Sequence, residues 1–75
     1  MGHGVRMQEL PGIGMRYDID LGRPDHRVSV IVHRDGAREL YVFASTDEEP
    51  TAVLELSEEQ ARKLSAVLNE TFFES

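Results

Sequence analysis

The chain has 75 residues, no cysteine and a formal net charge of −6. A chain this short forms a single domain, 1–75, and buries only about 60–65% of its unfolded surface, so its own core is small. Without cysteine it has no disulfide or thiolate zinc site. The acidic balance argues against a nucleic-acid partner, because phosphate binding needs a basic surface. No apolar run approaches the roughly 18 residues of a membrane span, so we expect no direct insertion into a membrane.

The first predicted strand covers residues 5–9 and leads into Leu10-Pro11-Gly12-Ile13-Gly14. Proline fixes φ and the two glycines permit backbone geometries closed to other residues. Two interpretations are open. One is a turn with Leu10 and Ile13 in the core. The other is a loop that cradles a phosphate, although such loops usually carry a lysine and open directly into a helix.

A second predicted strand follows at 15–21, where polar and apolar residues alternate with period two. Tyr17, Ile19 and Leu21 would point to one side of the sheet, and the intervening polar residues to the other. The Gly- and Pro-containing segment 22–26 is then predicted to be a polar loop between strands.

Residues 27–43 are predicted to form a central hairpin around Asp35-Gly36, rich in the β-branched and aromatic residues that suit a pleated surface. A two-residue loop would place Val28, Val30 and Val32 with Phe43, Tyr41 and Glu39. A three-residue loop, with Gly36 in a bulge, pairs His33 with Ala37 and puts the three valines on one face with Leu40, Val42 and Arg38. The second register gives the cleaner apolar face, and a buried face normally fixes register. We therefore favour it.

The residue pattern in the last third of the chain predicts an acidic connection at 44–50, a strand at 51–56 and one helix. Ser57 and Gln60 have the spacing of a capping box, in which each side chain bonds the other residue's amide. The helix should continue to about Asn69. Its apolar stripe, Ala61, Leu64, Val67 and Leu68, should face the apolar side of the sheet.

These elements predict an α+β fold: a small antiparallel sheet of four to five strands, with a central hairpin and one C-terminal helix packed on one face. Phe72 and Phe73 follow the helix. A domain of this size cannot easily bury two adjacent phenylalanines, so we expect at least one to contact a following segment or a second chain.

The polar residues do not form a recognisable catalytic or metal site. His26 and His33 lie about 20 Å apart along one extended strand, too far to share an ion. The serines have no base at a recognisable spacing, and the run Asp47, Glu48 and Glu49 is typical of a solvated loop. We therefore predict no enzyme activity, no metal and no cofactor. His33 is a candidate pH sensor, because histidine titrates near neutral pH and Arg34 and Arg38 would disfavour its charged form.

Three segments carry a resemblance to a known family: Glu9 to Tyr17, with Leu-Pro-Gly-Ile-Gly followed by Arg and an aromatic residue; His33 to Tyr41; and Leu56 to Leu64. In this order they resemble the N-terminal domain of the cytoplasmic regulatory subunit of bacterial potassium/proton antiporters. Those subunits also carry a C-terminal TrkA-C (RCK-C) ligand-binding domain, which is absent from this sequence. Nucleotide or ion binding attributed to that domain is therefore not expected here.

The resemblance implies a non-catalytic regulatory and assembly domain that acts on a membrane cation/proton antiporter. It also implies a cytoplasmic location, peripheral to the inner face of the membrane through the transporter, and a homodimer. Predicted partner contacts are Pro11, Gly12, Ile13, Gly14, Arg16, Phe72 and Phe73. Arg16 has an alternative role inside the fold, pairing with Asp18 or Glu39. The alternative function is a free-standing small-molecule-binding module, a dimeric one-helix α+β domain.

Overall fold

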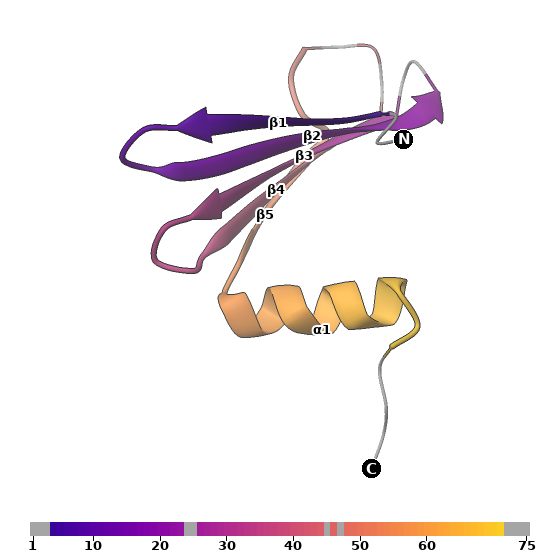
Figure 1. Ribbon diagram of the computed structural model, residues 1–75. Coiled ribbons are helices and arrows are strands. Elements are labelled where there is room, and N and C mark those ends of the chain that lie inside the picture. Colours follow the sequence, from indigo (N-terminus) through magenta and orange to yellow (C-terminus); the bar gives the residue numbers. More distant parts are fainter. Residues whose placement is uncertain (1–3, 24–25, 45, 47, 72–75) are drawn as a thin grey trace.

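The computed structural model describes residues 4–23, 26–44, 46 and 48–71, which form five strands and one helix (Figure 1). The strands are β1 (Val5–Leu10), β2 (Gly14–Arg23), β3 (His26–His33), β4 (Arg38–Phe43) and β5 (Ala52–Leu56), and the helix is α1 (Glu58–Leu68). Every neighbouring pair is antiparallel and the order is β1-β2-β3-β4-β5, so the sheet is a simple meander. The predicted α+β class and its single C-terminal helix are confirmed.

The central hairpin adopts the three-residue loop that the apolar pattern favoured. The His33 amide donates to the Ala37 carbonyl at 2.8 Å, and Val32 lies opposite Arg38. Gly36 has a φ of +101°, a conformation that glycine adopts without a Cβ clash. Val28, Val30 and Leu40 consequently share one face with Arg38, and Ile19 and Leu54 join them across the neighbouring strands. We call this the apolar face and the opposite side the polar face.

The connection between β2 and β3 differs from the prediction of a polar loop at 22–26. β2 runs to Arg23 and β3 begins at His26, with a register irregularity between Asp20 and Arg23. The Asp20 carboxylate accepts a hydrogen bond from the Gly22 amide at 2.8 Å, and Gly22 has a φ of +86°. The strand therefore continues through Gly22 by a local shift of register, although composition alone predicts that this glycine ends the strand.

The capping box predicted at the start of α1 is present. The Gln60 amide donates to the Ser57 hydroxyl at 3.1 Å, and the Ser57 amide donates to the Gln60 side chain at 2.9 Å. Asn69 caps the other end of the helix, as expected. The cap fixes where the chain leaves β5 and turns beneath the apolar face (Figure 1).

The helix covers the apolar face less completely than the stripe predicted. Its principal contact is with β5. Val67, an expected member of the stripe, is 59% exposed, and no apolar side chain within the described ranges is buried. Ser29, at 6% exposure, is the buried residue of this part of the chain. The helix and the sheet thus face each other across an incompletely filled space.

Candidate functional site

The turn between β1 and β2 contains three of the predicted partner contacts, Pro11, Gly12 and Ile13, and a fourth, Gly14, begins β2. The Ile13 amide donates to the Leu10 carbonyl at 2.9 Å, and Gly12 has a φ of +79° after Pro11, as in a type II turn. β2 follows directly, so the segment is built as a hairpin turn and lacks the helix that a phosphate loop opens into. The expectation that Ile13 is buried is wrong: its side chain is 48% exposed at the tip of the hairpin.

Gly14 differs from its neighbours because it is packed against backbone. A Cβ at this position would lie 1.9 Å from the Val32 carbonyl oxygen, and φ is +154°. The Arg34 amide also donates to the Ile13 carbonyl at 2.9 Å, so the two hairpins meet here. The close approach of the Val32 carbonyl is sufficient to explain why a glycine occupies position 14. A role of Gly14 in binding a partner stays a prediction.

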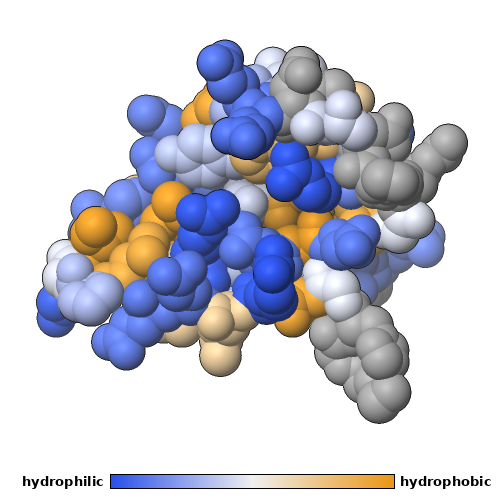
Figure 2. All heavy atoms as spheres, turned by 90° about the horizontal axis from the view of Figure 1, so that it is seen from above, coloured by the Kyte–Doolittle hydropathy of each residue, from blue (hydrophilic) through white to orange (hydrophobic). Residues whose placement is uncertain are grey.

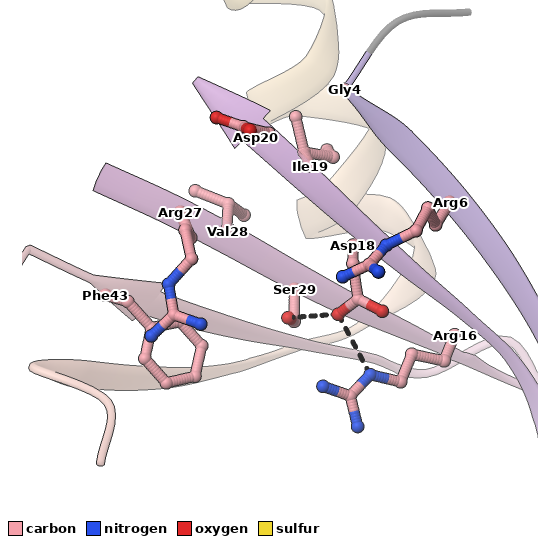
Figure 3. A pocket seen from close by; sticks show the side chains of 10 residues that line it. All are labelled: Gly4, Arg6, Arg16, Asp18, Ile19, Asp20, Arg27, Val28, Ser29 and Phe43. Atoms are coloured by element: carbon pink, nitrogen blue, oxygen red, sulfur yellow. Dashed lines mark hydrogen bonds and ion pairs between the residues drawn. The ribbon is translucent and has the colours of Figure 1, made fainter. Parts of the chain in front are cut away.

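Arg16 lies in a polar cluster on the polar face, as its alternative role predicted. Its Nε is 3.0 Å from Asp18 Oδ1, and the Ser29 hydroxyl donates to the same oxygen at 2.6 Å (Figure 3). Burial raises the pKa of Asp18, but the hydrogen bonds from Ser29 and Arg16 and the positive charge of Arg6 outweigh it and hold the pKa below its usual value. Of the two partners predicted for Arg16 inside the fold, Asp18 is therefore the one that it contacts.

The same cluster borders a hollow of 460 Å³ that extends along β1, β2 and β3. Arg27 places its guanidinium 4.5 Å from the centre of the Phe43 ring at the far side of this hollow (Figure 3). Figure 2 views the molecule from this side, where hydrophilic residues are interspersed with apolar ones. Because Asp18 already engages Arg16, the cluster is chiefly a cross-strand network that holds β2 against β3.

His33 has a different electrostatic environment from the one predicted. Its Nε2 is 3.2 Å from Glu39 Oε1, and Arg38 belongs to the opposite face of the sheet. The Tyr41 hydroxyl donates to the same Glu39 oxygen at 3.3 Å; burial and the Glu39 charge raise the pKa of Tyr41. The sequence prediction counted cations next to His33 in the chain and missed the carboxylate that the hairpin register brings across from β4.

A groove of 620 Å³ lies between α1 and the apolar face. Its sheet wall and its helix wall are mainly apolar, with two arginines among the lining residues. These residues are Ile19, Leu21, Val28, Val30, Arg38, Leu40, Leu56, Ala61, Arg62, Leu64, Ser65 and Leu68. The sequence indicates both apolar surfaces but predicts that they are in contact, so the groove itself was not predicted.

The described residues contain neither a metal-ligand cluster nor a helix fit to span a membrane. Among the residues described, no three histidine or acidic side chains lie close enough to hold a metal ion together. No helix in these ranges has the length and apolar character needed to cross a membrane. Phe72 and Phe73, the remaining predicted contacts, lie outside the described residues.

The meander and its capped helix define a small α+β domain with exposed apolar surface. Residues 3–72 match the family model of the N-terminal domain of the K⁺/H⁺ antiporter subunit KhtT, and the chain belongs to this family. The resemblance seen in the three sequence segments is thereby confirmed at the level of the KhtT N-terminal domain.

Two relatives from Bacillus subtilis (strain 168) align with the chain over 65 residues. The uncharacterized protein YrvC is 43% identical, and the K⁺/H⁺ antiporter subunit KhtT is 34% identical. Each alignment covers 85% of this chain and 39% of the relative. The chain therefore spans well under half the length of these curated relatives.

Proposed function

We propose that this chain is a non-catalytic regulatory and assembly domain through which a cytoplasmic subunit engages a membrane K⁺/H⁺ antiporter. The observation that carries the proposal is the family match over residues 3–72. The domain then lies at the inner face of the membrane because it is held there by the transporter. In this proposal, ligand binding of the TrkA-C type belongs to a separate domain of such a subunit.

Exposed apolar side chains supply the physical reason for docking. Ile13 at the hairpin tip is 48% exposed, and Val5 and Met7 on the edge strand β1 are 50% and 66% exposed. Ile13 lies at the hairpin tip and Val5 and Met7 lie along the β1 edge, so the domain offers two separate apolar places for protein contacts. We assign the turn at 11–14 and the adjoining Arg16 to the transporter, and the β1 edge to a second copy in a homodimer.

Co-purification with the antiporter's membrane subunit tests this assignment. The variant Ile13→Asp places a charge at the hairpin tip, where the isoleucine is 48% exposed. It should reduce the retained transporter at least about tenfold, the effect of losing an apolar anchor that is buried in the complex. Val67→Asp is the matched control, because Val67 is also apolar and exposed but lies on α1. Equal retention by both folded variants would contradict a docking role for the turn.

The pH-sensing role of His33 remains part of the proposal. Its Nε2 lies 3.2 Å from Glu39 Oε1, so gain of a proton strengthens a contact between β3 and β4. The test compares retention of the transporter at mildly acidic and mildly alkaline pH in the unmodified chain and in His33→Gln. An unchanged pH dependence in the variant would remove His33 from the mechanism.

The groove between α1 and the sheet favours a second candidate function, a small-molecule-binding module. Its 620 Å³ lies within the range of about 300–1,000 Å³ common to ligand sites. A ligand that binds only the folded chain must raise its melting temperature. Screening for such a rise distinguishes this candidate, because a domain that only docks to a transporter shows none.

A further inference from the structure

The groove beneath α1 has opposite chemical character at its two ends. Arg38 lies across from Leu56, the last residue of β5, and Arg62 is in the first turns of the helix that follows. Both arginines therefore line the end where the chain passes from β5 into α1. At the other end Leu21 of β2 and Leu68 of the helix line the groove.

We propose that this groove binds a single-chain amphipathic anion, with its carboxylate at Arg38 and Arg62 and its alkyl chain along the apolar remainder. The site names the ligand class for the second candidate function, binding in the groove, and rests on that candidate but not on the proposed docking to a transporter. A fatty-acid-like molecule matches the groove in charge at one end and in apolar character over the rest.

The apolar part of the groove has the surface that an alkyl chain would cover. Leu21, Leu64 and Leu68 are 54%, 38% and 76% exposed, although all three border the space between helix and sheet. Val30 and Leu40 form its floor, as register partners on β3 and β4. Filling the space removes apolar surface from water on both walls at once, which is the dominant favourable term in such binding.

The basic end has hydrogen-bond donors available for a carboxylate. One Arg38 nitrogen donates to the Gly36 carbonyl, and a guanidinium has five N–H groups, so further donors remain. Arg62 Nη2 lies 3.5 Å from Glu58 Oε2 in an exposed pair, which is weakened by solvent and can be exchanged for a ligand. The first helical turn at this end carries Glu58 and Glu59, and Glu59 pairs with Lys63 at 4.0 Å. Glu58 alone then opposes Arg38 and Arg62, which leaves a net positive charge at this end.

The size of the groove favours an alkyl chain over a helix from another protein. A helix about 10 Å across fills roughly 420 Å³ for each 5.4 Å turn. The 620 Å³ of the groove would therefore hold fewer than two helical turns. So short a helix offers less contact surface than the roughly 800 Å² that each partner buries in a stable interface. An extended single chain can use the full length of the groove.

Isothermal titration calorimetry with laurate, kept below its micelle concentration, tests the proposal on the 75-residue chain. We expect saturable one-to-one binding, with dodecanol binding more weakly because it lacks the charge and acetate not binding because it lacks the chain. Amide NMR shifts should concentrate on the groove residues. No saturable binding of laurate, or shifts confined to the polar face, would overturn the proposal.

Two matched variants separate recognition from general charge. Arg62→Gln should weaken laurate binding by about 3- to 10-fold, the effect of losing one charge-assisted hydrogen bond at a partly exposed site. Lys63→Gln loses a similar helix pair, with Glu59 at 4.0 Å, but lies outside the groove and should leave binding unchanged. Equal weakening by both variants would refute the site.

Two further outcomes identify a different occupant of the groove. A dimer that cannot bind laurate, and whose interface by amide NMR lies at the groove and not at the β1 edge, would assign the groove to a second copy and overturn the proposal. Binding to phosphatidylglycerol vesicles without binding to free laurate would assign the surface to a membrane and would also overturn it. Either result leaves the co-purification test of the proposed function unaffected.

Discussion

Ser29 on β3 donates a hydrogen bond of 2.6 Å to the Asp18 carboxylate, directly across from it on β2. Ser29 is the buried residue of the described part of the chain, and Arg16 supports the same carboxylate oxygen at 3.0 Å. A polar contact thus occupies the best-shielded position in a sheet whose described apolar side chains are all partly exposed. The sheet is fixed by cross-strand pairing as well as by burial.

Removing the Ser29 hydroxyl should weaken this strand pair. We expect Ser29→Ala to lower the free energy of unfolding by about 1 kcal/mol, since one hydrogen bond is lost while Arg16 still pairs with the carboxylate. Urea denaturation followed by circular dichroism measures the change. Ser65→Ala is a suitable comparison, because the Ser65 hydroxyl only donates back to the Arg62 carbonyl on the exposed helix. A loss as large in Ser65→Ala would contradict the special role of Ser29.

Asp18 should make the stability of the chain sensitive to acid. Its pKa is lower in the folded chain than in the unfolded one, because Ser29 and Arg16 hold the charged form against the opposing effect of burial. Its contribution is therefore complete above roughly pH 5 and is lost as the pH falls below about 4, toward the folded-state pKa. The variant Asp18→Asn should not show this loss of stability below pH 5. Urea midpoints measured from pH 5 downward would show the difference. Glu48→Gln, on an exposed loop, should retain the loss.

The two glycines of the first hairpin should respond differently to alanine. Gly12 has open space where a Cβ would lie but a φ of +79°, so Gly12→Ala should cost about 1 kcal/mol. Gly14→Ala places a methyl group against the Val32 carbonyl and should cost about 3 kcal/mol or more, because the backbone must move. Thermal melts measure both. Similar losses in the two variants would contradict the close approach at Gly14.

The capping box should determine whether α1 is held in place beneath the sheet. We expect Ser57→Ala to lower the free energy of unfolding by about 1 kcal/mol, the usual effect of losing an N-cap. Amide hydrogen exchange should rise first in the turn that begins at Glu58. Protection that is unchanged in this turn would show that contacts with β5, and not the cap, fix the helix.

The elements and the hairpin register could be predicted because each has a local cause. The three valines of β3 alternate with other residues, and only the three-residue loop places them beside Leu40 and Val42. The capping box likewise depends on Ser57 and Gln60 alone. Signals of this kind are contained in a few consecutive residues, so no knowledge of the tertiary structure is needed.

The sites formed between elements could not be predicted in the same way. The contact of Ser29 with Asp18 depends on the register of β2 and β3, which no short stretch of the sequence specifies. The irregular end of this strand pair, near Gly22, was predicted to be a loop. The carboxylate next to His33 comes from the neighbouring strand. The groove depends on how far α1 stands from the sheet, a tertiary distance that an apolar stripe does not specify.

The most direct test of docking through Ile13 is a measurement of K⁺/H⁺ exchange in membrane vesicles. The measurement compares the regulatory subunit that carries the intact domain with the same subunit that carries Ile13→Asp. We predict that the intact subunit alters exchange and that the folded variant leaves exchange as it is without any subunit, because the docking turn is lost. Regulation by Ile13→Asp equal to that by the intact subunit, with Val67→Asp also unchanged, would contradict the proposed docking.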